Sequence, residues 1–163
     1  MKNFLLTYWI SMIVLFIVFY WEVSPLSSVI NLWQTDLTSF LTSMVLPSHM
    51  MENNHILISL KYNLVIEKAC NGMMLYLFFL APIIAFPATL QHKIGWAIGG
   101  YFIILGVNTF RIWFITQLVL DERSNFSLAH DYLGNILLII TSILLFMAFV
   151  KSRKKRLKQV AYA

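Results

Sequence analysis

Four long apolar runs constrain what this chain can fold into. They cover residues 4–21, 73–90, 94–120 and 133–150. Each run has the length of about 17 residues or more at which a helix can cross the hydrocarbon of a bilayer. Hydrophobic residues make up 60% of the sequence and charged residues only 12%, which is far below the charged share of a soluble domain. We therefore predict an all-α integral membrane protein with about four transmembrane helices, forming a single membrane domain over residues 1–163.

The first run has some features of a secretory signal peptide. Its apolar part is longer than the core of such peptides usually is, and Tyr20-Trp21-Glu22 offers no pair of small residues for cleavage. We therefore expect residues 4–21 to be retained as the first span.

The segment between the first two runs, residues 22–70, is too polar to lie in the bilayer core. After Pro25, apolar residues recur at helical spacing opposite a polar face, which predicts an amphipathic helix in the membrane interface or against the bundle. Pro47 is expected to end this helix, and residues 48–54 are expected to form a loop. Apolar and polar residues then alternate over residues 56–67, which predicts an extended or hairpin segment that could present an edge to a peptide.

Prolines and glycines shape the next two runs. Pro82 and Pro87 lack backbone N–H donors and are expected to kink the second helix or to end its regular part. In the third run, Gly95 and Gly99 lie four positions apart, a spacing that lets another helix approach closely.

Basic residues indicate which side of the membrane is cytoplasmic. With four spans both termini lie on one side, which holds Lys2, Lys93 and six basic residues in the tail 151–163. The other side holds only three basic residues, which are Lys61, Lys68 and Arg123. Because cytoplasmic loops carry the excess of Lys and Arg, we predict a multi-pass protein of the cell (inner or plasma) membrane with cytoplasmic termini.

The tail also bears on possible partners. It holds half of the twelve basic residues, so the net charge of +5 indicates membrane lipids and not nucleic acid as the partner of this surface.

The predicted topology places the start of the second span, the end of the third and the loop before the fourth together at the outer face.

The only cysteine, Cys70, stands at the outer start of the second span. If Cys70 and Asn71 are the first residues of a helix, its unpaired N–H groups and the positive end of its dipole favour a thiolate. Cys70 is therefore a candidate nucleophile. The alternative is that a lone cysteine in an apolar protein is a small buried hydrophobe.

A charged side chain lies deep inside the third span. Arg111 is nine residues before Leu120, on the order of 13 Å below the outer surface at 1.5 Å per residue. A central arginine costs roughly 3 kcal/mol to insert, and such charges usually face a bundle interior or a watery cavity. Arg111 is therefore a candidate functional residue, although it can also snorkel to lipid headgroups. Asn108, three residues earlier on the same face, is expected to hold the guanidinium or to line the same cavity.

His130 and Asp131 stand at the outer start of the fourth span. A neutral imidazole within reach of Cys70 can take the thiol proton and later return it to a leaving amine. The alternative is that His130 is a helix cap or an interfacial side chain. Asp131 either orients the imidazole or caps the helix with a negative charge at its N-terminus. The other histidines form no ligand cluster, so the sequence predicts no metal site and no cofactor.

Three short motifs belong to segments that reach the predicted outer face: Ala69-Cys70-Asn71-Gly72, Asn108-Thr109-Phe110-Arg111, and His130 followed by Gly134. Together, in this order and spacing, they resemble the exosortase/archaeosortase family of multispan membrane cysteine transpeptidases. The resemblance covers about residues 61–134. Asn71 departs from the family pattern, in which a serine often follows the cysteine.

The resemblance implies a compact enzyme that processes exported proteins carrying a C-terminal sorting signal, made of a short motif, a membrane helix and a basic cluster. It implies Cys70 as the nucleophile, Arg111 as the arginine of the site and His130 as the acid and base. Asn71, Asn108 and Asp131 would be supporting residues. The reaction would pass through a thioester on Cys70, and the product would go to an unknown acceptor, water or an amine.

Two questions stay open at the level of sequence. Arg111 can stabilise the oxyanion, as backbone N–H groups also can, or it can hold a substrate carboxylate or carbonyl. The protein can also be a non-catalytic small membrane subunit or assembly factor, in which Arg111 pairs helices and Cys70 is a packing residue.

Overall fold

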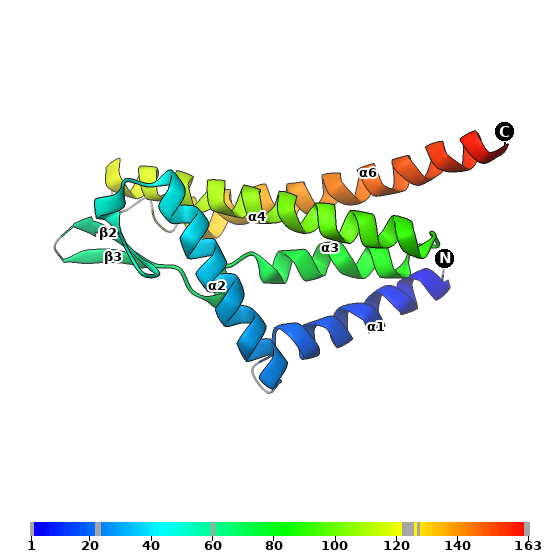
Figure 1. Ribbon diagram of the computed structural model, residues 1–163, viewed down its shortest axis with the longest axis horizontal. Helices are drawn as coiled ribbons and strands as arrows, with labels where there is room; N and C mark the ends of the chain where they lie inside the picture. The colour runs from blue at the N-terminus through cyan, green and yellow to red at the C-terminus, as the bar shows by residue number, and fades with distance from the viewer. Residues whose placement is uncertain (1, 22–23, 60, 122–125, 127, 162–163) are drawn as a thin grey trace.

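The apolar runs of the sequence form helices that lie side by side along the long axis of the molecule (Figure 1). The computed structural model describes residues 2–21, 24–59, 61–121, 126 and 128–161, and of these the side chains of residues 2–3, 129, 131 and 154–161 are not described. The long-axis helices are α1 (Lys2–Phe19), α3 (Met73–Ala85), α4 (Leu90–Asp121) and α6 (Asn135–Ala161). The start of α1 and the end of α6 lie at one end of the molecule, and a small sheet lies at the other end (Figure 1).

Two segments in the described ranges are long and apolar enough to cross a membrane. They are α4 and the segment Tyr132–Arg153, most of which belongs to α6. α1 and α3 are apolar but shorter. The helix predicted over residues 73–90 ends at Ala85, because Phe86 is extended ahead of Pro87. The helices are those of a membrane protein, and the number of four spans stays a prediction.

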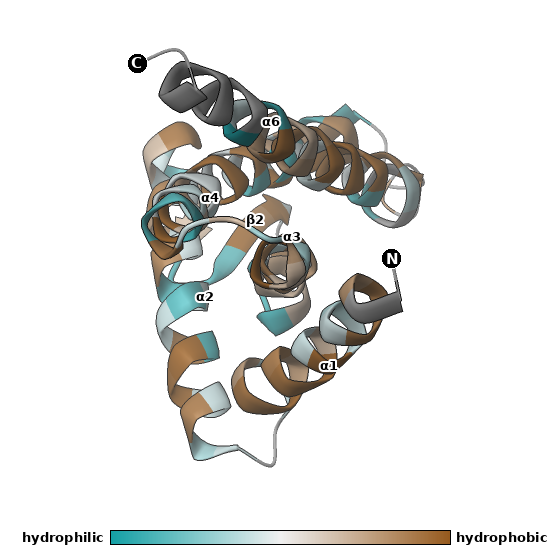
Figure 2. Ribbon diagram, turned by 90° about the vertical axis from the view of Figure 1, so that its right-hand side faces the viewer, coloured by the Kyte–Doolittle hydropathy of each residue, from teal (hydrophilic) through white to brown (hydrophobic). Residues whose placement is uncertain are grey.

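α3 lies at the centre of the bundle (Figure 2). It packs against α1, α4 and α6, and its residues Phe79 and Ala81 are at most 1% exposed. A Cβ atom at Gly100 of α4 would overlap the ring of Phe79, so these two helices approach closely at a glycine. The close approach is not made at Gly95 or Gly99, around which the described part of the chain leaves open space.

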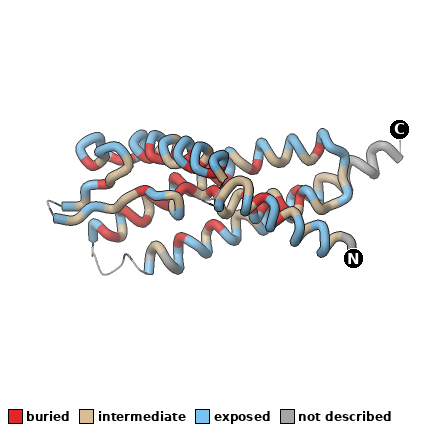
Figure 3. The backbone as a smooth tube through the Cα atoms, turned by 90° about the horizontal axis from the view of Figure 1, so that it is seen from below, coloured by how far each residue is buried: buried red, intermediate tan, exposed pale blue. Residues whose placement is uncertain are grey.

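Many bulky apolar side chains of the helices are exposed. Exposed and buried positions alternate along the long helices, as expected where one side of each helix faces the bundle (Figure 3). Examples with 57% to 64% exposure are Leu6, Ile98, Phe102 and Met147. An apolar surface of this extent is unfavourable in water and is matched by lipid. The surface therefore agrees with the composition in indicating a membrane protein.

α2 (Pro25–Val45) is amphipathic and buries its polar side. Ser24 caps the helix by accepting a hydrogen bond from the Ser27 N–H, and Pro25 occupies the first turn, where its missing N–H costs nothing. The buried positions are all polar, and they are Ser27, Asn31, Gln34, Thr38, Ser39 and Thr42. On the opposite side Trp33 and Met44 are 59% and 67% exposed. Of the two predicted placements the structure has the helix against the bundle, where it contacts α4 with its polar side inward and crosses the other helices obliquely (Figure 1).

The structure contains the hairpin and extends it to three antiparallel strands. Their order in the sheet is β1 (Met51–Glu52), β2 (His55–Ser59) and β3 (Tyr62–Val65). The loop predicted over residues 48–54 is partly regular, because η1 (Ser48–Met50) leads directly into β1. β1 turns into β2 through Asn53, which has a positive φ of 56°.

One face of the sheet rests on α4. Ile56 and Ile66 are 1% and 2% exposed and pack in one cluster with Ile112 of that helix. This contact holds the sheet over the end of α4 and brings the chain that leaves β3 back toward the bundle.

Candidate active site

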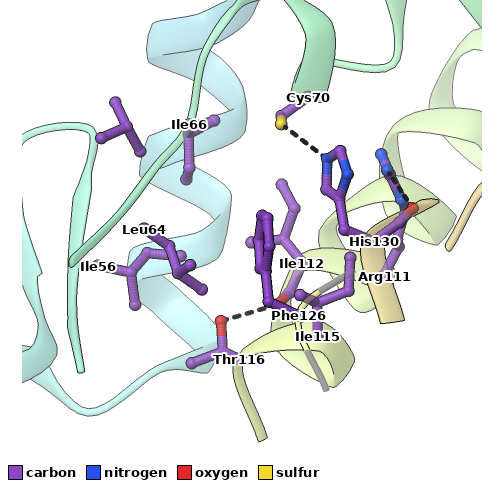
Figure 4. Close-up of a pocket in the computed structure, with 11 residues that line it drawn as sticks. Ile56, Leu64, Ile66, Cys70, Arg111, Ile112, Ile115, Thr116, Phe126 and His130 are labelled. Carbon is purple, nitrogen blue, oxygen red and sulfur yellow. Dashed lines mark hydrogen bonds between the residues drawn. The ribbon is translucent and has the colours of Figure 1, made fainter. Parts of the chain in front are cut away.

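A thiol and an imidazole meet at the end of the bundle that carries the sheet. Cys70 ends η2 (Lys68–Cys70), a single turn before α3, and His130 lies in η3 (Leu128–Gly134), a π-helical turn before α6. The Sγ atom of Cys70 lies 3.5 Å from Nε2 of His130 (Figure 4), a hydrogen-bonding distance for sulfur. The ring of Phe126 stacks on the imidazole with centroids 5.2 Å apart. The structure thus brings together two candidates that are 60 positions apart in sequence.

Arg111 is buried beside this pair. Its side chain is 3% exposed, and its Nη2 donates to the backbone carbonyl of His130 at 3.5 Å and to Oδ1 of Asn135 at 3.2 Å. A guanidinium held in this way does not snorkel to the surface. It instead holds the turn that carries His130. The sequence does not indicate a role for Asn135, because it is a single polar residue within an apolar run.

The three side chains line one small cavity of about 60 Å³ (Figure 4). Its other walls are mostly apolar and come from β2, β3, the residue that follows β3, α4 and the segment before η3. They are Ile56, Leu64, Val65, Ile66, Ile112, Ile115, Thr116 and Phe126. The cavity therefore offers a mostly apolar recess with reactive and charged groups on one side.

The backbone of the nucleophile is held from α4. The Nδ2 atom of Asn108 donates a 2.8 Å hydrogen bond to the carbonyl of Cys70. Gly72 has a φ of +77°, and a Cβ atom there would lie 3.2 Å from Cγ of Asn108. Asn108 was expected to hold the guanidinium of Arg111 or to line its cavity, and its amide instead binds the peptide of Cys70. The left-handed backbone conformation of Gly72 and its close contact with Asn108 together explain why a glycine stands at this position of the motif.

Asn71 links the start of α3 to the polar side of α2. It is 0% exposed, its Oδ1 accepts the N–H of Met73 at 2.9 Å, and its Nδ2 lies 3.2 Å from Oδ1 of Asn31. Gln34 donates to the Asn71 carbonyl at 3.1 Å and accepts a 2.6 Å hydrogen bond from the hydroxyl of Tyr101. Asn71, which departs from the family pattern, therefore accepts the N–H of the first residue of α3 and lies at the centre of a buried polar network. The only available signal for Gln34 was its place on the polar face of α2.

The surroundings of Cys70 lower the pKa of its thiol below the ordinary value of 9.0. Burial is the largest single influence and raises the pKa. The hydrogen bond and positive charge of His130, a backbone hydrogen bond at Glu67 and the charge of Arg111 lower it, and together they outweigh burial. A lowered pKa increases the thiolate fraction near neutral pH, and the thiolate is the reactive form.

The structure places Cys70 outside the helix in which the sequence predicted it. Cys70 does not occupy the first positions of the second span, because α3 begins at Met73 and Cys70 lies in the preceding turn. The groups that lower its pKa are the side chains of His130 and Arg111 and a backbone hydrogen bond at Glu67. The side chain of Asp131 lies outside the described residues, and so does Arg123, so neither role proposed for Asp131 is tested.

No cluster suited to a metal ion is present in the described ranges, where no three His, Cys, Asp or Glu side chains gather closely enough. His92 lies far from the site, near the start of α4, where its Nε2 lies 3.1 Å from the hydroxyl of Ser152.

The fold and the site define a helical membrane protein with a cysteine and histidine pair beside a buried arginine. The chain belongs to the transmembrane exosortase family, because the model of that family matches residues 2–147. No match was found among curated proteins or solved structures. Membership of the family indicates a membrane transpeptidase role and protein substrates with sorting signals.

Proposed function

We propose that this protein is a membrane cysteine transpeptidase that cleaves the C-terminal sorting signal of exported proteins and transfers the product to an acceptor. The observation that carries the proposal is the 3.5 Å contact between Sγ of Cys70 and Nε2 of His130. The lowered pKa of the thiol and the family membership support the same assignment.

The first half of the reaction forms a thioester. His130 takes the thiol proton, and the Cys70 sulfur attacks the carbonyl carbon of the scissile peptide bond, so that negative charge develops on the carbonyl oxygen. When this intermediate collapses the carbon–nitrogen bond breaks, and His130 gives its proton to the departing amine. The acyl part of the substrate is then bound to Cys70.

The second half releases the acyl group. An amine, or water, attacks the thioester carbonyl and loses a proton to His130. The carbon–sulfur bond breaks, and the thiolate is restored and can be protonated by His130. Transfer to an amine conserves the acyl bond energy in a new amide, whereas water gives a free carboxylate.

Arg111 has two tasks in this proposal. Its contact with the carbonyl of His130 positions the turn that carries the imidazole. Its positive charge lies on the wall of the same cavity, where it stabilises the oxyanion of the tetrahedral intermediate. A substrate carboxylate or carbonyl is the other group that this guanidinium can hold.

We place the site at the outer face of the cell membrane, with both termini in the cytoplasm. The start of α1, the start of α4 and the end of α6 lie at the end opposite the sheet (Figure 1). Lys93, Lys151 and Arg153 belong to these segments, and an excess of basic residues is typical of the cytoplasmic side. An exported substrate would then reach the site from outside.

The proposal is tested by trapping the acyl-enzyme. Protein purified from its host membranes at neutral pH is quenched in acid, and its intact mass is measured. Because Cys70 is the only cysteine, a hydroxylamine-sensitive adduct on a thiol reports on this site alone. We expect the adduct in the wild-type protein and in Ser43→Ala, an exposed change on α2, and no adduct in Cys70→Ala. Normal substrate cleavage by Cys70→Ala would exclude the mechanism.

Thiol labelling separates this enzyme from a non-catalytic membrane subunit. A membrane-impermeant maleimide added from the outer side at neutral pH should label native Cys70 quickly. A thiol that reacts only after unfolding would instead indicate that Cys70 is a packing residue.

A further inference from the structure

β3 is an edge strand that leads directly into the site. The sheet order β1, β2, β3 places β2 on one side of β3, and no described strand lies on its other side. An edge strand carries a row of unpaired N–H and C=O groups that can pair with another chain.

The register of the hairpin identifies which backbone groups face outward. The N–H of Ile66 donates to the carbonyl of Asn54 at 2.8 Å, and Leu64 is opposite Ile56, so Leu64 and Ile66 direct their backbone groups toward β2. Successive residues of an antiparallel strand direct these groups to opposite sides. Asn63 and Val65 therefore direct theirs toward the free edge, where the described residues provide no backbone partner.

The free edge adjoins the cavity of the candidate active site. Val65 lines the same cavity as Cys70, Arg111 and His130, and only five positions separate Val65 from Cys70. The cavity has a volume of about 60 Å³. One water molecule needs about 10–15 Å³, so the cavity can hold a few of them. It therefore suits one small apolar side chain of a bound segment.

We propose that the free edge of β3 binds the extended segment of the substrate as an additional strand. The residues before the scissile bond pair with Asn63 and Val65, and the scissile carbonyl reaches Cys70. This inference rests on the proposed function and adds to it the surface that binds the peptide segment of the substrate. An extended peptide is the partner that such an edge fits, because a lipid chain has no backbone donors or acceptors and those of a membrane helix are already paired within the helix.

The topology also gives the direction of the bound strand. β3 runs from the sheet end toward α3, and thus toward the bundle (Figure 1). In the proposed substrate the exported part precedes the scissile bond and the membrane helix follows it. The substrate strand therefore runs parallel to β3, with its acyl side along the edge and its leaving side toward the lipid.

The experiment compares two alkylating reagents that carry the same reactive group. Acetyl-Ala-Ala-Val-chloromethyl ketone has its peptide on the acyl side, and chloroacetone has no peptide. The full-length protein in detergent is incubated with each reagent, and alkylation of Cys70 is followed by intact mass. We expect the peptide reagent to react at least about tenfold faster, after correction for its rate with a free thiol, as edge hydrogen bonds of ordinary strength predict.

Two changes test the edge itself. Single N-methylation of the central or of the last residue of the peptide should slow the reaction unequally, by about fivefold to tenfold in one case only, because alternate N–H groups face the edge. In the protein, Val65→Pro removes an outward N–H that β2 does not use, and it should slow the peptide reagent more than it slows chloroacetone. Val65→Ala keeps the N–H and shortens only the side chain, so it should reduce the advantage of the peptide reagent less than Val65→Pro does.

The outcomes separate this inference from the proposed function. A peptide reagent no faster than chloroacetone, or equal effects of the two N-methyl groups, would overturn the edge proposal while leaving the reactive thiol in place. If chloroacetone alkylates the wild-type protein no faster than His130→Ala, the proposed function fails. If Val65→Pro slows both reagents to the same extent, the variant does not report on the edge, and the two N-methylated reagents on the wild-type protein decide between the outcomes.

Discussion

The side-chain amide of Asn108 donates a 2.8 Å hydrogen bond to the backbone carbonyl of Cys70, across 38 positions of sequence. One turn further along the same helix, Arg111 donates to the backbone carbonyl of His130. α4 therefore holds the backbone on both sides of the thiol and imidazole pair. Both residues of the pair are thus held by hydrogen bonds from one helix.

We predict that Asn108→Asp slows alkylation of Cys70 by iodoacetamide at neutral pH by about tenfold. The substitution replaces a donor by a carboxyl oxygen facing the Cys70 carbonyl, and an unsatisfied buried acceptor costs about 1–3 kcal/mol. The matched control is Gln117→Glu, which makes the same chemical change at an exposed position of α4 and should leave the rate unchanged. A normal rate in Asn108→Asp would show that the hydrogen bond does not position the thiol.

The lowered pKa of Cys70 predicts the pH dependence of its reactivity. Alkylation should rise with pH through a midpoint below 9.0, because the folded protein favours the thiolate. In His130→Ala the midpoint should move upward, since burial remains and the main groups that lower the pKa are gone. Rates measured from pH 5 to pH 10 in both proteins test this, and a midpoint that moves downward or does not move would contradict it.

The lowered pKa of Cys70 also predicts how the free energy of unfolding changes with pH. Between the lowered native pKa and the ordinary value of 9.0, the unfolded chain binds more protons at Cys70 than the folded chain does. The contribution of this group to the free energy of unfolding therefore increases with pH across that window and is lost as the pH falls through the native pKa. Comparing wild-type protein with Cys70→Ala isolates this contribution, and it is contradicted if the difference decreases as the pH rises.

Much of this arrangement follows from the sequence because length and periodicity are strong signals in a membrane protein. The apolar runs, the amphipathic pattern after Pro25 and the alternation before Cys70 all correspond to elements of the structure. The predicted topology placed Cys70 and His130 at the same end of the bundle, and in the structure Sγ and Nε2 lie 3.5 Å apart.

The partners of the polar residues could not be predicted in this way. Asn108 and Arg111 share a helix face by spacing, but spacing does not say which neighbouring segment that face meets. The polar side of α2 can face water or protein, and its periodic pattern does not reveal buried partners such as the Asn71 carbonyl, which accepts from Gln34 at 3.1 Å. Asn135 was missed because one amide in an apolar run carries no periodic signal.

We predict that Arg111→Lys reduces substrate processing by about tenfold or more and lowers the melting temperature. A lysine ammonium is a point charge and cannot reproduce the planar group that contacts both the His130 carbonyl and Oδ1 of Asn135. Arg153→Lys, at the other end of the bundle, is the matched control and should process normally. Full activity in Arg111→Lys would mean that only the charge of the side chain matters.

Two glycines are expected to respond in opposite ways to substitution by alanine. Gly72→Ala should destabilise the protein by about 1–2 kcal/mol and slow Cys70 alkylation, because a left-handed backbone is costly for alanine and the new Cβ atom would press on Asn108 at 3.2 Å. Gly106→Ala on α4 has open space around its Cβ atom in the described part of the chain, so it should stabilise the helix by about 0.5–1 kcal/mol. Thermal unfolding of the two variants in the same detergent measures both effects. Both variants add one methyl group, so opposite changes in the free energy of unfolding come from the backbone conformation and the contact with Asn108. Equal changes would contradict the proposed reason for a glycine after Asn71.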